Sequence, residues 1–179
     1  MQIVFLRQLL VVTVKILSDL FIIRSIMEKR IRYQSLTKKF YKDVELLQLR
    51  FKDELNNIWT YNELKVLISQ KQIFSEICLI NKKVIGFSIF KKIDEHLELY
   101  IIFVSPEHRR LGIGRDLILN GINFCKKKFL NEILIEVNIN NSSAISFYKK
   151  LKFTNLGIRK NYYNVNGEEF DALLMVLNI

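Results

Sequence analysis

The sequence is poor in residues that interrupt or cross-link a chain. It contains one proline, six glycines and two cysteines among 179 residues. So little proline and glycine excludes collagen-like and low-complexity chains. Two cysteines are too few for a disulfide scaffold and are typical of a reducing compartment, so we expect a cytoplasmic protein. Half of the residues are hydrophobic, which is enough for a single domain with its own core.

Acidic residues are scarce relative to basic ones. The chain has 28 lysines and arginines against 18 aspartates and glutamates, a net charge of +10. This sign favours acidic partners such as nucleic acid, ribosomes, phosphorylated cofactors or anionic membranes. The chain also has 25 isoleucines, 19 lysines and 15 asparagines, a bias typical of AT-rich genomes. The basic charge alone therefore predicts no specific nucleic acid as a partner.

Residues 1–26 form the most hydrophobic stretch, but charged residues interrupt it. Arg7, Lys15, Asp19 and Arg24 break the run, whereas a membrane-spanning helix needs about 18 or more apolar residues with few charges. The polar residues of its first part share one face of a helical wheel, which predicts an amphipathic helix. We therefore expect an N-terminal extension over 1–26 and a single domain over 27–179.

Several interpretations of this extension stay open. It could lie as a helix on a membrane surface, or serve as an organellar presequence. Translation could instead start at Met27, and residues 1–26 would then be a gene-model extension. A secretory signal peptide is disfavoured because no small-x-small cleavage site follows the apolar stretch.

The hydrophobic pattern of the remaining chain changes between the strand period and the helix period. We expect strands over 31–36, 75–80, 84–93, 97–105, 132–139, 156–165 and 170–177, and helices over 37–50, 60–69, 112–129 and 141–151. Thr60 and Glu63 form a capping box, and Asn166-Gly167 is a strong hairpin signal. Hairpins on both sides of one strand–helix–strand unit predict a mixed sheet in an α/β or α+β fold.

A short arginine- and glycine-rich segment lies between the strand ending near Ser105 and the next helix. It reads Arg109-Arg110-Leu111-Gly112-Ile113-Gly114-Arg115. A helix N-terminus offers free N–H groups and a partial positive charge, and glycines let a phosphate approach the backbone closely. Arginines add paired hydrogen-bond donors. The segment therefore predicts a pyrophosphate-binding loop.

Two other interpretations of this loop exist. A dinucleotide-binding turn is disfavoured, because its third glycine would fall on Leu117 and no second strand–helix–strand series follows. An ordinary helix start flanked by solvated arginines stays open from the residues alone. A nucleoside-triphosphate loop is not predicted, since no G-x-x-x-x-G-K-S/T stretch exists.

The loop resembles the acetyl-coenzyme A signature Q/R-x-x-G-x-G/A of the GCN5-related N-acetyltransferases, through Arg109, Gly112 and Gly114. The run from Glu132 to Phe153 is similar to the L-E-V-R-x-S-N-x-x-A-x-x-L-Y-x-x-x-G-F pattern of the RimI-type ribosomal-protein alanine N-acetyltransferases in this superfamily. Residues 158–163 resemble their I-R-x-x-Y-Y, and residues 167–175 resemble their G-x-E-D-A-x-x-M ending. The resemblance covers about residues 32–179. It implies a mostly antiparallel sheet flanked by helices, with a splayed strand pair that holds the cofactor.

The resemblance also implies roles for individual residues. Glu136 occupies the position of the general base and Tyr148 that of the general acid. Acetyl-coenzyme A would be the co-substrate, and no metal is implied. The cofactor-binding positions are Ile102, Phe103 and Val104 along the pantetheine arm, Arg110, Leu111, Gly112, Ile113, Gly114 and Arg115 around the pyrophosphate, and Asn141.

The activity that the resemblance implies is acetyl transfer to the N-terminal α-amine of a protein. The expected partner is the N-terminal alanine of a small-subunit ribosomal protein. Two alternatives remain: an acetyltransferase of this fold that acts on a lysine or a small amine, and a catalytically inactive basic module that binds ribosomes or RNA. The oligomeric state is not predicted.

Three positions depart from the family pattern. Lys152 replaces the glycine of G-F, so we expect an altered turn there. The F-P-W segment of many relatives survives only as Asn57-Ile58-Trp59, which affects the substrate-side helix. Phe170 is inserted between Glu169 and Asp171, which predicts a bulge at the start of the last strand.

Overall fold

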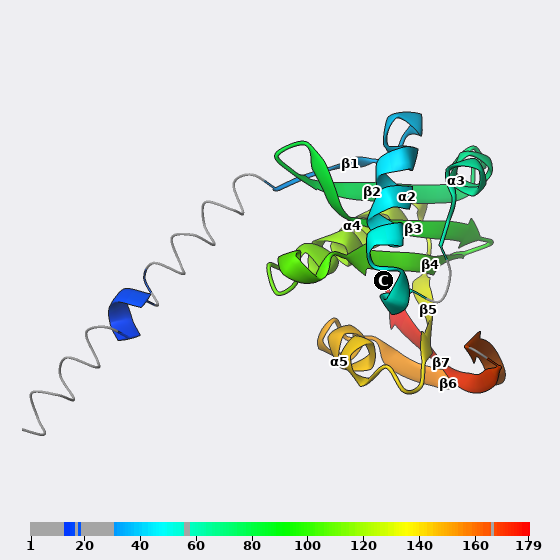
Figure 1. Ribbon diagram of the computed structural model, residues 1–179. Helices are drawn as coiled ribbons and strands as arrows, with labels where there is room; N and C mark the ends of the chain where they lie inside the picture. The colour runs from blue at the N-terminus through cyan, green and yellow to red at the C-terminus, as the bar shows by residue number, and fades with distance from the viewer. Residues whose placement is uncertain (1–12, 17, 19–30, 56–57, 166) are drawn as a thin grey trace, which may run out of the picture.

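The computed structural model describes residues 13–16, 18, 31–55, 58–165 and 167–179. In this part of the chain, one seven-stranded sheet has helices on both faces (Figure 1). The strands are β1 (Ile31–Ser35), β2 (Ile73–Ile80), β3 (Lys83–Ile93), β4 (His96–Val104), β5 (Glu132–Asn138), β6 (Thr154–Val165) and β7 (Glu168–Asn178). The helices are α2 (Tyr41–Arg50), α3 (Tyr61–Ile68), α4 (Ile113–Lys128) and α5 (Ser142–Lys150), with short 3-10 turns η1 (Lys38–Phe40), η2 (Lys52–Glu54) and η3 (Pro106–His108).

The predicted strands and helices are confirmed to within a few residues, but the three 3-10 turns were not predicted. The N-terminal extension lies outside the described residues except for 13–16 and 18, which are helical. Its contact with a membrane surface therefore stays a prediction. Among the described helices, none has the length and hydrophobicity needed to cross a membrane.

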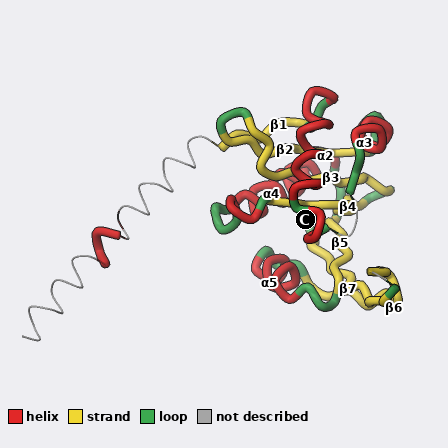
Figure 2. The backbone as a smooth tube through the Cα atoms, in the orientation of Figure 1, coloured by secondary structure: helices red, strands yellow, loops and turns green. Residues whose placement is uncertain are grey.

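The strand order is β1-β2-β3-β4-β5-β7-β6, and neighbouring strands are antiparallel except for β4 and β5. Helix α4 connects this parallel pair. The backbone trace shows α2 and α3 on one side of the sheet and α4 on the other, with α5 beside β6 and β7 (Figure 2). The expected mixed, mostly antiparallel sheet is confirmed.

The parallel pair separates after only a few residues. β4 and β5 are paired from His96 with Glu132 to Leu99 with Ile135. On the other edge of β4, Leu99 and Ile101 pair with consecutive residues of β3, so Tyr100 is an extra residue. Such a bulge bends the strand that contains it. Beyond it, β4 is paired only with β3, and β5 continues beside β7. The expected splayed strand pair is therefore present.

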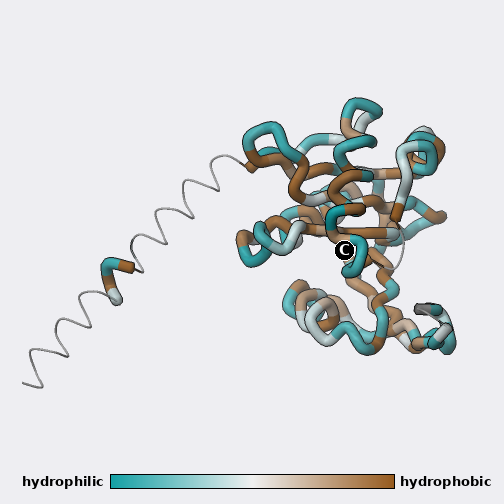
Figure 3. The backbone as a smooth tube through the Cα atoms, viewed as in Figure 1, coloured by the Kyte–Doolittle hydropathy of each residue, from teal (hydrophilic) through white to brown (hydrophobic). Residues whose placement is uncertain are grey.

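Hydrophobic clusters cover both faces of the sheet, and Figure 3 shows hydrophobic residues along its strands. Under α2 and α3 the cluster includes Val44, Leu47, Leu64, Ile77, Phe87, Ile89 and Phe103. Under α4 and α5 it includes Ile118, Cys125, Ile133, Ile135, Val137, Tyr148, Leu173 and Met175. A smaller cluster joins the start of α4 to β2 and β3. Both cysteines are free and buried, so their thiols belong to the packed interior.

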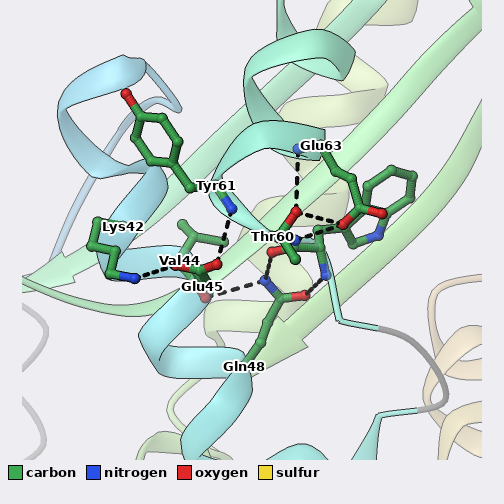
Figure 4. A network of polar contacts seen from close by, with 8 residues as sticks. Lys42, Val44, Glu45, Gln48, Thr60, Tyr61 and Glu63 are labelled. Atoms are coloured by element: carbon green, nitrogen blue, oxygen red, sulfur yellow. Dashed lines mark hydrogen bonds and ion pairs between the residues drawn. The ribbon is translucent and has the colours of Figure 1, made fainter.

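A buried glutamine fixes the connection between α2 and α3 (Figure 4). The Gln48 side chain is fully buried. Its Nε2 donates to the carbonyl of Trp59 at 3.0 Å, and its Oε1 accepts from the Trp59 N–H at 3.0 Å. The next residue, Thr60, begins the predicted capping box with Glu63, which is confirmed. Trp59 of the divergent Asn57-Ile58-Trp59 segment is thus anchored, while Asn57 lies outside the described residues.

Lys152 adopts a left-handed backbone conformation, with φ of 72°. The N–H of Lys152 donates to the Lys149 carbonyl, and that of Phe153 donates to the Tyr148 carbonyl. These bonds close the end of α5 in the way that a glycine favours. The lysine therefore bears backbone strain, since residues other than glycine rarely adopt this backbone conformation.

The extra residues near the last strand lie in β6, so the prediction of a bulge at the start of β7 is wrong. Phe170 pairs regularly with Tyr163, and the register shifts between Arg159 and Tyr163. Asn161, with φ of 54°, donates its N–H to Asp171 Oδ1 at 3.0 Å. This bond holds the bulge of β6 beside β7.

Replacing Lys152 by glycine should stabilise the protein. Glycine adopts positive φ without the steric cost of about 1–2 kcal/mol that an L side chain bears, although its freedom in the unfolded chain offsets part of the gain. We expect the free energy of unfolding, measured by urea denaturation, to rise by about 0.5–1 kcal/mol. Lys152→Ala is the matched control and should give no such gain. Equal free energies of unfolding for Lys152→Gly and Lys152→Ala would contradict the prediction that the Lys152 backbone is strained.

Candidate active site

Glu136 lies on β5 where the strand has left β4. Its neighbours Ile135 and Val137 are 3% and 6% exposed and pack under α4 and α5. Because side chains alternate along a strand, Glu136 faces the opposite side of the sheet. Its side chain is 31% exposed, and its Oε1 lies 3.1 Å from Nη1 of Arg159. The sequence-based expectation that Glu136 faces away from both neighbours is confirmed.

The bulge of β6 surrounds Glu136 with three side chains. Besides Arg159, the Tyr163 hydroxyl donates to the Glu136 carbonyl at 3.2 Å. The Arg159 guanidinium lies over the Tyr162 ring, 4.3 Å from its centroid. The family resemblance places Arg159, Tyr162 and Tyr163 in the I-R-x-x-Y-Y motif but implies no role for them. That motif is the sequence signal by which they could have been found.

These two tyrosines are held in the neutral form. A hydrogen bond with Glu136, followed by burial, raises the pKa of Tyr162. Burial and the Glu136 charge raise the pKa of Tyr163 to about 12. Both phenols therefore remain protonated near neutral pH, where they can donate hydrogen bonds.

Tyr148 lies on α5 and packs its ring into the cluster under α4 and α5. It is 7% exposed, and its ring centroid lies 5.1 Å from that of Phe147 and 5.5 Å from that of Phe153. Burial raises its pKa well above the ordinary value, and the nearby Tyr163 adds to this shift. Within the described residues, the fully buried side-chain polar atoms without a hydrogen-bond partner are Ser88 Oγ and His96 Nε2, the latter 3.5 Å from Glu98 Oε1. The Tyr148 hydroxyl is not one of them.

The arginine- and glycine-rich loop forms the start of α4. Gly112 is the N-cap residue with φ of 86°, and Arg110 has φ of 65°. The Asp116 N–H bonds to the Gly112 carbonyl, so the N–H groups of the three preceding helical residues have no partner within the helix. A Cβ on Gly114 would lie 3.3 Å from the Phe147 ring. The loop therefore combines exposed arginines, free N–H groups and close contact with α5.

Arg109, the first residue of the signature, contacts β4 and η2. Its Nε donates to the Val104 carbonyl at 3.0 Å, and its guanidinium pairs with Glu54 of η2. The guanidinium also lies near the Phe103 ring. Arg109 therefore ties η2 to the end of β4, and Arg110 and Arg115 remain as the exposed cations of the loop.

The other expected cofactor positions lie at both sides of the splay. Ile102, Phe103 and Val104 follow the bulge of β4, where the edge that faces β5 has no strand partner. Asn141 is the N-cap of α5, and its Oδ1 accepts from the Ala144 N–H at 3.0 Å. The structure thus shows Asn141 as a helix cap, and its contact with a cofactor stays a prediction.

Comparisons with known proteins agree with this geometry. The sequence model that describes the acetyltransferase (GNAT) family matches residues 35–153 of this chain. The ribosomal protein bS18-alanine N-acetyltransferase of Escherichia coli K12 is 33% identical over 99 residues, which are 55% of this chain and 67% of that protein. The protein of the same name from Haemophilus influenzae is 31% identical over 119 residues, 65% of this chain and 80% of that protein.

Solved structures show the same fold. The crystal structure of the Escherichia coli ribosomal-protein-S18-alanine N-acetyltransferase superposes with a TM-score of 0.73 at 25% identity, covering 83% of this chain and 94% of that one. Arabidopsis thaliana NAA60 in complex with acetyl-CoA superposes with a TM-score of 0.71, covering 83% of this chain and 98% of that one. Its 19% identity shows the fold alone.

The left-handed backbone conformation of Gly112 in the loop can be tested by substitution. A Cβ at Gly112 would meet nothing within 4 Å, but φ is 86°. Gly112→Ala should therefore destabilise the protein by about 1–2 kcal/mol through backbone strain alone. Gly157 also has open space around it but no positive φ, so Gly157→Ala is the matched control and should not destabilise. Thermal unfolding measures both, and equal midpoints would contradict the prediction.

Proposed function

The chain belongs to the acetyltransferase (GNAT) family, and we propose that it transfers the acetyl group of acetyl-CoA to the N-terminal alanine of ribosomal protein bS18. The supporting observation is a carboxylate, Glu136, that directly follows the last pair of β4 and β5, in a chain whose relatives carry this activity in their names. An acceptor on the ribosome would place the enzyme in the cytoplasm.

We assign cofactor binding to the splay and to the start of α4. Backbone groups of Ile102 to Val104 would pair with the amides of the pantetheine arm in place of a neighbouring strand. The free N–H groups of α4 and the exposed Arg110 and Arg115 would bind the pyrophosphate, since a helix N-terminus and arginines both favour phosphate oxygens.

In this proposal Glu136 takes a proton from the attacking amine. The nitrogen forms a bond to the thioester carbonyl carbon, and the bond from that carbon to sulfur breaks. One proton leaves the nitrogen for the Glu136 carboxylate, and the thiolate gains a proton or a hydrogen bond from the Tyr148 hydroxyl. Arg159 pairs with Oε1 of Glu136, so an arriving ammonium group would replace one cation by another. It would lose one proton to solvent before the neutral nitrogen attacks, and the second proton is the one that goes to Glu136.

The raised pKa of Tyr148 refines its role. An ordinary tyrosine has a pKa of about 10 and a thiol about 8.5, so complete proton transfer to a thiolate is already uphill by about 2 kcal/mol. Burial makes the transfer less favourable still. Tyr148 would therefore act mainly by donating a hydrogen bond to the sulfur as its charge develops.

A terminal amine suits this chemistry better than a lysine. The α-amine has a pKa of about 8 against about 10.4 for lysine, so the neutral form costs about 3.3 kcal/mol less to reach. A single carboxylate without a metal would be a sufficient base for such an acceptor. This difference favours an N-terminal acceptor over the lysine alternative.

The first test is mass spectrometry of peptides incubated with acetyl-CoA and the full chain. A peptide copying the N-terminus of bS18 should gain one acetyl group on its α-amine. A peptide with a blocked N-terminus and free lysines is the control and should stay unmodified. Glu136→Gln should lower kcat/KM by about 100-fold or more, and Tyr148→Phe by about 10- to 100-fold.

Other outcomes would replace the proposal. Binding of acetyl-CoA without modification of the bS18 peptide would point to a different amine. Modification of the blocked peptide would point to a lysine acceptor. The absence of both binding and modification would favour the basic binding module, and steeply salt-dependent binding of RNA would then support it.

The dependence of rate on pH separates the two kinds of acceptor. With the bS18 peptide, kcat/KM should rise with pH and level off above about 8, where the α-amine becomes neutral. Because burial and Glu136 raise the pKa of Tyr163 to about 12, and Tyr148 is shifted in the same direction, neither phenol should cause a decline below pH 10. A rise that continued to about 10.4 would indicate a lysine instead.

A further inference from the structure

A tyrosine of the edge strand contacts the first turn of α4. The Tyr33 hydroxyl on β1 donates to Oδ2 of Asp116 at 2.9 Å, in a half-buried position and across 83 residues of sequence. Cys78, which is fully buried, lies against the same hydroxyl. The resemblance to known acetyltransferases assigned no role to Tyr33 or Asp116.

Asp116 is an unfavourable residue for a helix that binds a phosphate. It is the acidic residue in the first turn of α4, directly after Gly114 and Arg115. A carboxylate there repels the pyrophosphate and competes with it for the same cations and N–H groups. Asp116 already contacts one of these cations, because its Oδ1 lies 3.9 Å from Nη1 of Arg115. The position of this carboxylate therefore matters for cofactor binding.

The Tyr33 hydroxyl holds that carboxylate on the side of β1. It donates to Oδ2, and the other carboxylate oxygen, Oδ1, is the one that lies near Arg115. Desolvation and the bond to Asp116 raise the pKa of Tyr33 far above the ordinary value. The hydroxyl therefore stays protonated and donates at every pH at which the protein would work.

We infer that Tyr33 is a positioning residue for acetyl-CoA: its hydroxyl keeps the Asp116 carboxylate against β1 and so leaves Arg115 and the α4 N-terminus available to the pyrophosphate. Without the hydroxyl, the carboxylate is free to pair fully with Arg115. Acetyl-CoA then has to displace it. This inference rests on the proposed placement of the pyrophosphate.

The test is Tyr33→Phe, which removes the hydroxyl and keeps the ring. We expect the Kd for CoA, measured by titration calorimetry, and the KM for acetyl-CoA to rise about 3- to 10-fold, with kcat at saturating acetyl-CoA unchanged. The effect should shrink as salt is raised, because the competing contacts are ionic. Tyr61→Phe is the matched control, since Tyr61 lies on α3, on the side of the sheet opposite α4, and it should leave the Kd for CoA unchanged.

Rescue by a second substitution separates positioning from simple packing. Asp116→Asn removes the competing charge, so the double variant Tyr33→Phe with Asp116→Asn should bind CoA at least as tightly as the wild type. A double variant as weak as Tyr33→Phe alone would overturn the inference, and so would an unchanged Kd in Tyr33→Phe. A wild-type chain that fails to bind CoA would instead overturn the proposed function.

Discussion

Tyr100 is one residue more than β4 needs to match β3, and the parallel pairing of β4 with β5 ends directly before it. The strands then diverge, and backbone groups on their facing edges lose their strand partners. Glu136 faces one side of the sheet, while the Tyr148 ring packs on the other side with α5. In a closed sheet these two groups could not act on the same bond. The divergence of β4 and β5 is therefore the condition for the whole proposed site.

The charges around the divergence are arranged by sign. Positive groups gather at the start of α4, where Arg110 and Arg115 are exposed and helix N–H groups are free. The Glu136 carboxylate lies on β5 and is paired with Arg159 of β6. The neutral Tyr162 and Tyr163 lie beside Glu136 and keep their protons near neutral pH. An anionic cofactor and a cationic acceptor would thus each meet the opposite sign.

Sequence patterns predicted most elements because their signals are local. The capping box of Thr60 and Glu63 and the alternation of Ile135, Glu136 and Val137 can be read from neighbouring residues. The bulge at Tyr100 lies inside the continuous β-rich run LELYIIFVS and exists only through its register with β3. Likewise, the insertion of Phe170 was visible, but β6 rather than β7 accommodates the extra residues.

The contacts within the site were less predictable than the elements, because they join residues that are distant in sequence. Arg159 and Glu136 are 23 residues apart and meet across β7, with which both of their strands pair. Asn141 matched a cofactor position, yet its side chain also caps α5, a role that follows from local geometry alone. Motifs thus identified the reactive residues, but their partners depended on how the strands pair.

The short pairing between β4 and β5 also has a mechanical consequence. Four residue pairs, from His96 with Glu132 to Leu99 with Ile135, are the strand contacts between β1–β4 and β5–β7 in the described structure. Each half has its own ladders, and α4 packs against strands on both sides. The connection between the two halves therefore depends mostly on side-chain packing. Helix α4 and one hydrophobic cluster with members from both β4 and β5 hold the halves together beyond the four ladder pairs.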